Sequence, residues 1–110
     1  MTEDEVLQTF ATRGTQIGGE WFFQPKVCLD LVSECESNGL AVIGIEGFKI
    51  DGSEVVPQLD LIADWSNVEV KEWEAFVAEA SALSRKFIET ISVASGILLN
   101  LTIVSEKECS

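Results

Sequence analysis

The central segment of the chain reads Leu40-Ala-Val-Ile-Gly-Ile-Glu-Gly-Phe-Lys-Ile-Asp-Gly52. Residues 40–45 are a continuous apolar run, which is typical of a buried strand. Residues 48–50 alternate between apolar and charged side chains, and Asp51-Gly52 is a hairpin-turn signal. A return strand then begins at Val55. The sequence therefore predicts a β-hairpin in the middle of the chain.

The continuation of the return strand is ambiguous. Pro57 has no N–H to give to a ladder, so it limits this strand to an edge or an end of the sheet. In residues 59–65, alternate positions are apolar, but only part of the remainder is polar. The pattern leaves open a strand or an irregular crossing.

Two helices are expected before the hairpin. Thr2 and Glu5 have the spacing of a capping box, which predicts a helix over residues 3–12. Pro25 suits the first turn of a second helix, and Asn38-Gly39 supplies its end. Two cysteines on that helix are two turns apart, about 10.5 Å of axial rise, which is too far for a disulfide. We expect them to be buried thiols on one apolar face with two aliphatic residues (Cys28, Leu31, Val32 and Cys35).

The longest helix is predicted over residues 67–91. Ser66 and Glu69 have the capping-box spacing, and an apolar stripe continues from Trp73 to Ile91 over about five turns. Residues 97–104 then have the branched composition of a strand. A strand, a crossover helix and a second strand in one sheet usually form a parallel unit. The sequence predicts one α/β (α+β) domain over residues 1–110, with a small mixed sheet of roughly three to four strands and helices packed on it.

The chain carries 19 acidic and seven basic side chains and no histidine, for a formal net charge of −12. Such a field attracts cationic partners and repels nucleic acid. The lack of histidine removes the side chain most used for proton transfer and for holding zinc. We therefore expect a binding protein that is not an enzyme, with no cofactor and no metal.

No apolar run approaches the roughly 20 residues that a membrane helix requires. Three of the first five residues are acidic (Glu3, Asp4 and Glu5), whereas a secretory signal begins with basic residues. These observations predict a cytoplasmic protein without a membrane partner, and they leave its oligomeric state open.

Residues 46–79 hold nine acids and only two bases. This acidic segment either faces a basic protein partner or is an ordinary solvated surface. Trp65 stands out within it, either as an aromatic anchor of an interface or as a core residue. The candidate partner-binding residues are Glu46, Asp60, Asp64, Trp65, Glu69 and Glu72.

Gly44-Ile-Glu-Gly-Phe48, followed by Pro57, Asp60 and Asp64-Trp-Ser66, resembles small bacterial colicin-like immunity proteins of polymorphic toxin systems. The resemblance covers roughly residues 21–70. It implies a protein that binds one cognate toxin in the producing cell and blocks its active site or an exosite. It brings no catalytic residues and no defined contact residues with it.

Two other hypotheses belong to different functional classes. A small carboxylate-dependent hydrolase would need an apolar pocket that encloses Glu46 and raises its pKa. A non-catalytic scaffold subunit would bind through an apolar patch, for which Phe22 and Phe23 are the candidates.

Overall fold

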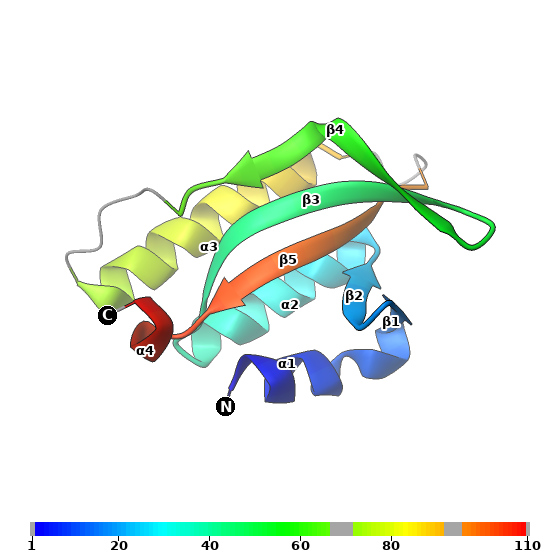
Figure 1. The fold of residues 1–110 in the computed structure, drawn as a ribbon. Helices are drawn as coiled ribbons and strands as arrows, with labels where there is room; N and C mark the ends of the chain where they lie inside the picture. The colour runs from blue at the N-terminus through cyan, green and yellow to red at the C-terminus, as the bar shows by residue number, and fades with distance from the viewer. Residues whose placement is uncertain (1, 67–71, 92–95, 110) are drawn as a thin grey trace.

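The computed structural model describes residues 2–66, 72–91 and 96–109, which fold into one sheet with helices packed on it (Figure 1). The predicted α+β class is confirmed. The strands are β1 (Gly14–Ile17), β2 (Glu20–Phe23), β3 (Ala41–Asp51), β4 (Glu54–Asp64) and β5 (Leu98–Val104). The α-helices are α1 (Glu3–Thr9), α2 (Pro25–Ser37), α3 (Trp73–Glu89) and α4 (Glu106–Cys109), and a 3₁₀ turn at Ala11–Arg13 follows α1.

The strand order is β1-β2-β5-β3-β4, and every neighbouring pair is antiparallel. The expected mixed sheet of three to four strands is therefore an antiparallel sheet of five strands within the described residues. Since β4 and β5 both run antiparallel to β3, they run in the same direction on either side of it. The crossover through α3 thus joins two parallel strands, as predicted, but these strands are not neighbours.

The additional strands are β1 and β2, which form a short hairpin. Gly18 and Gly19 make its turn at φ values of 60° and 83°, a region that glycine enters without steric cost. This hairpin was not predicted, because each of its strands is only four residues long.

The hairpin of β3 and β4 confirms the central prediction. β3 lies between β5 and β4, and the apolar start of the strand is fully buried at Ala41, Val42 and Ile45. Gly52 occupies the turn at a φ of 62°. The ambiguous return segment is a strand as far as Asp64, and β4 is an edge strand, as Pro57 predicted.

A bulge interrupts β4. Glu46 lies opposite Ile62, but the next residue of β3, Gly47, lies opposite Gln58, so residues 59–61 have no partner on β3. Leu61 turns inward against the main core, whereas the side chain of Leu59 is 81% exposed. A Cβ atom at Gly47 would lie 2.8 Å from the Cβ of Leu61, closer than such atoms approach. The bulge therefore requires glycine at position 47.

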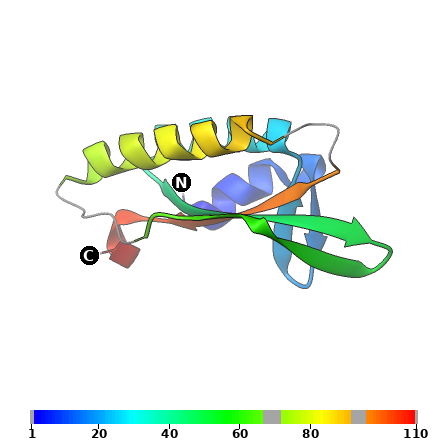
Figure 2. The same ribbon diagram turned by 90° about the horizontal axis from the view of Figure 1, so that it is seen from above.

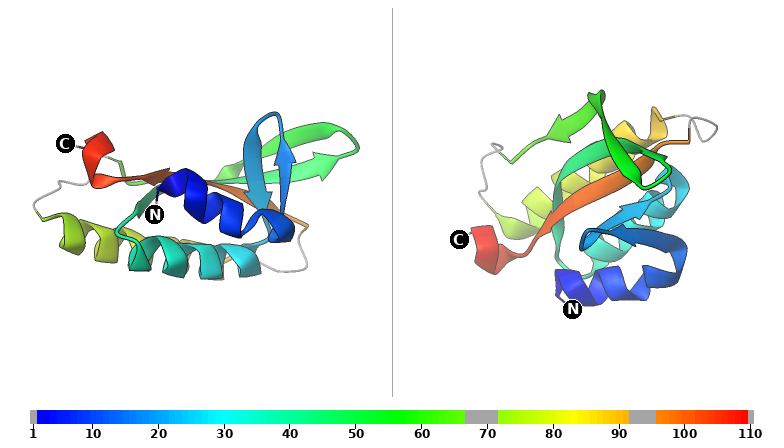
Figure 3. Two further views of the ribbon diagram at one scale, coloured as in Figure 1. Left: turned by 90° about the horizontal axis from the view of Figure 1, so that it is seen from below. Right: turned by 45° about the vertical axis from the view of Figure 1, so that its right-hand side comes forward.

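The helices α2 and α3 cover one face of the sheet, and the opposite face, which we call the open face, is not crossed by them (Figure 2). Both β-hairpins bend away from this helix layer (Figure 3). The predicted apolar face of α2 lies in the core, and its two cysteines are buried and free. Burial raises the pKa of both thiols, that of Cys35 to about 12.

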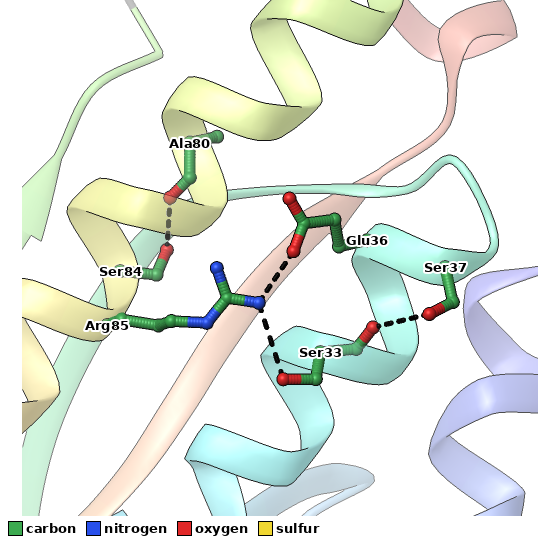
Figure 4. A network of polar contacts seen from close by, with 6 residues as sticks. All are labelled: Ser33, Glu36, Ser37, Ala80, Ser84 and Arg85. Atoms are coloured by element: carbon green, nitrogen blue, oxygen red, sulfur yellow. Dashed lines mark hydrogen bonds and ion pairs between the residues drawn. The ribbon is translucent and has the colours of Figure 1, made fainter.

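A polar contact joins α2 and α3 at the surface. The Arg85 guanidinium donates to the Glu36 carboxylate at 2.6 Å and to the Ser33 hydroxyl at 3.3 Å (Figure 4). Glu36 and Arg85 are 49 residues apart in the sequence, so this contact joins two helices that lie side by side in the fold but far apart along the chain.

The beginning of α3 differs from the prediction. The helix begins at Trp73, with Glu72 as an N-cap that makes no side-chain cap hydrogen bond, and it ends at Glu89. Glu69 of the expected capping box and the first residues of the predicted helix lie outside the described residues. The capping box of Thr2 and Glu5 is present on α1. None of the described helices is both long enough and apolar enough to cross a membrane.

The substitution Gly47→Ala should destabilise the fold by about 1–3 kcal/mol, because the new methyl group overpacks against Leu61. Gly44→Ala is the matched control on the same strand, since its Cβ would find nothing nearer than 3.5 Å. Urea denaturation followed by circular dichroism measures both variants. Equal midpoints for the two variants would show that the bulge does not depend on Gly47.

Candidate protein-binding surface

The register of the sheet places acidic residues together on the open face. Residues directly opposite each other on antiparallel strands share a face. Asp64, Gly44 and Thr102 form one such row across β4, β3 and β5, and Ile62, Glu46 and Asn100 form the next. The carboxylates of Glu46 and Asp64 are both exposed there.

These two rows surround a shallow hollow of about 190 Å³. It is lined by Gly44, which has no side chain, and by the polar residues Glu46, Asp64 and Thr102 and the apolar Ile62. A hollow with two carboxylates and an aliphatic wall suits the ammonium or guanidinium end of a long basic side chain, whose stem is apolar.

Ser66 holds the Asp64 carboxylate in place. The Ser66 backbone N–H donates to Asp64 Oδ1 at 2.8 Å. Hydrogen bonds from the Ser66 hydroxyl, and then from this N–H, lower the pKa of Asp64. Asp64 therefore keeps its negative charge at pH values that are low enough to protonate an ordinary aspartate.

Trp65 packs against the core of the protein. Its side chain is half-buried and packs against both hydrophobic clusters, one beneath α2 and one beneath α3. The indole Nε1–H donates to the Val42 carbonyl at 2.7 Å, and the backbone N–H donates to the Ile43 carbonyl at 3.0 Å. Of the two interpretations left open by the sequence, these contacts favour the packing role of Trp65.

The other candidate residues do not gather at the hollow. Asp60 is exposed in the bulge of β4, on the same strand as Asp64. Glu72 lies at the beginning of α3, where it lines a different depression together with Asn38 and Glu106. Glu69 lies outside the described residues. The structure therefore brings together Glu46 and Asp64, with Asp60 farther along the edge.

A second acidic region was not predicted from the sequence. The first turn of α1 and the short α4 line one depression, so carboxylates from both ends of the chain come together there. Burial, followed by the charges of Glu108 and Asp4, raises the pKa of Glu3. The acids of this region, which we call the terminal acidic cluster, are Glu3, Asp4, Glu5, Glu106 and Glu108.

The alternative sites also have defined positions. Glu46 is exposed, so the enclosed apolar pocket that the hydrolase hypothesis requires does not surround it. The prediction of an exposed apolar patch at Phe22 and Phe23 is wrong, because these residues are only 2% and 1% exposed. Phe22 packs edge-on against Phe48, and Phe23 lies in the main core.

Across the part of the chain that the structure describes, no group of three or more acidic or cysteine side chains is arranged to hold a metal ion.

Comparison of the chain with protein-family models, with curated proteins and with solved structures gave no match. Its function is therefore inferred from the charge and geometry of its surface.

The substitution Ser66→Ala should raise the pKa of Asp64 toward the ordinary aspartate value, because the hydroxyl hydrogen bond is lost while the backbone bond remains. Carboxyl ¹³C NMR over a pH titration measures this shift. Ser53→Ala, in the exposed hairpin turn, is the control. An unchanged Asp64 titration in the Ser66 variant would contradict the assigned role of Ser66.

Trp65→Phe should cost roughly 1–3 kcal/mol of stability, since it leaves the Val42 carbonyl without its indole donor beneath the sheet. Trp73→Phe removes an equally short indole bond, to the Gly39 carbonyl, but this bond is exposed and should cost about 1 kcal/mol or less. Thermal unfolding of both variants compares the two sites. A larger loss for the Trp73 variant would contradict the structural role of Trp65.

Proposed function

We propose that this chain is an immunity-type inhibitor that binds and neutralises a cognate bacterial toxin through an acidic surface, in the cytoplasm of the producing cell. The sequence resemblance to colicin-like immunity proteins supports this proposal, as does the net charge of −12. The surface consists of the Glu46 and Asp64 carboxylates at the hollow and Asp60 on the neighbouring bulge.

The observation that carries the proposal is that these three carboxylates are exposed and that none of them belongs to an ion pair between described residues. The two ion pairs between described residues lie elsewhere, Arg13 with Asp30 and Arg85 with Glu36. A carboxylate that is already paired with a cation of its own protein attracts a cationic partner only weakly. The open face and its edge therefore present a negative charge that a cationic surface can meet.

A basic toxin is the partner that this charge favours. Toxins that act on nucleic acid carry basic surfaces, because they neutralise phosphates with lysine and arginine. An acidic inhibitor presents a similar charge and can associate at up to about 10⁸–10⁹ M⁻¹s⁻¹ at low salt. Selectivity among toxins then comes from shape and from charges that fit only one partner.

The test is to capture the partner from the host of this chain at low and high salt and then to measure association with the purified partner. The double variant Asp60→Lys/Asp64→Lys should associate about tenfold more slowly or worse, with a weaker dependence on salt. Surface plasmon resonance at several salt concentrations gives both quantities.

The control variant Glu79→Lys/Glu89→Lys makes the same change in net charge on exposed positions of α3, in the helix layer. It should slow association much less, because steering depends on where the charge lies. Equal slowing by both variants would mean that only the net charge matters. Capture of a partner that is insensitive to salt and to both variants would overturn the proposed function.

A further inference from the structure

The outer edge of β4 is the most exposed apolar part of the described structure. Four large hydrophobic residues are exposed in the described part of the chain, and three of them belong to β4: Leu59 at 81%, Ile62 at 49% and Val56 at 40%. β4 is also the last strand of the sheet, next to β3 alone. β1, at the other edge, exposes no large hydrophobic side chain.

The backbone of this edge is available over the second half of β4. Trp65 donates its N–H to the Ile43 carbonyl, so it points toward β3. By the alternation of an antiparallel ladder, the N–H and C=O groups of Ile62 and Asp64 then point outward. The first half is blocked, because Pro57 has no N–H and the Gln58 side chain donates to the Val56 carbonyl at 3.2 Å.

The charge of this half-strand selects the kind of strand that can join it. Residues 59–64 contain Asp60 and Asp64 and no basic residue, and Glu46 lies beside them on the open face. Pairing with a second copy of this chain would double these carboxylates in one short ladder with no cation, on two chains that each carry −12. Like charges on paired strands are destabilising.

We infer that residues 59–64 bind an extended segment of the partner that alternates basic and apolar residues, which adds as a sixth strand to the sheet. This inference rests on the proposed function and specifies how the partner is held. Main-chain hydrogen bonds to Ile62 and Asp64 supply affinity. A lysine or arginine opposite Asp64 lies on the open face, where its apolar stem passes over Ile62 and its charged end reaches toward the hollow at Gly44. The apolar residues of the segment lie on the other face, beside Ala63.

The probe is a synthetic peptide that alternates lysine and valine. It is compared with the same peptide N-methylated at every amide, which keeps the charge and the apolar surface but cannot pair as a strand. Fluorescence anisotropy measures binding, and NMR measures amide exchange of the full chain.

The unmethylated peptide should bind at least about tenfold more tightly than the methylated one and should slow exchange at Ile62 and Asp64 by a similar factor. The Asp60→Lys/Asp64→Lys variant should lose this binding, and sedimentation should show a monomer without peptide.

Equal binding of the two peptides would overturn strand pairing while leaving electrostatic capture intact. Binding of neither peptide at low salt, slowed exchange at other residues, or a dimer of the unliganded chain would also overturn it. The proposed function is judged separately, by salt-sensitive capture of the natural partner, so the two failures are distinguishable.

Discussion

The positions of the acidic residues on β4 depend on the close approach of Leu61 to Gly47. Because position 47 has no side chain, three residues of β4 can leave the ladder and return to it. The inward turn of Leu61 contributes to the core, and the outward turn exposes Leu59 and Asp60. Beyond the bulge, the register sets Ile62 and Asp64 on the open face beside Glu46. A feature of packing thus determines which carboxylates can share a partner.

Trp65 and Trp73 connect the elements around α3 through indole hydrogen bonds. Trp65 ties the end of β4 to β3 through Val42, and Trp73 ties the beginning of α3 to the loop at Gly39. Both indoles contribute apolar area and one hydrogen bond to a backbone carbonyl, which is how a buried tryptophan is usually satisfied. With Trp65 committed to the core, the candidate surface consists of carboxylates and aliphatic side chains. In the proposed function, the affinity of this surface for a partner comes from charge and backbone pairing.

The sequence predicts the elements whose burial pattern is regular. The apolar run at 40–45 and the apolar face of α2 lie where they were expected, because strong periodicity leaves few other structures. The bulge could not be predicted, since it depends on the absence of a side chain on another strand. The terminal acidic cluster was missed for a similar reason: Glu3 and Glu108 are at opposite ends of the chain, and only the fold brings them together. Charge counted along the sequence therefore identified Asp64 and Glu46, but it also grouped them with Glu72, which lies elsewhere.

The fold offers two acidic regions, and the function proposed here assigns the partner to the open face and its edge. Hydrogen–deuterium exchange of the chain, alone and bound to the basic protein that it captures from its host, distinguishes these regions most directly. Exchange should slow over residues 59–64 and remain unchanged on the outer face of α3. Slowing confined to α3 or to the terminal acidic cluster would show that the partner binds elsewhere.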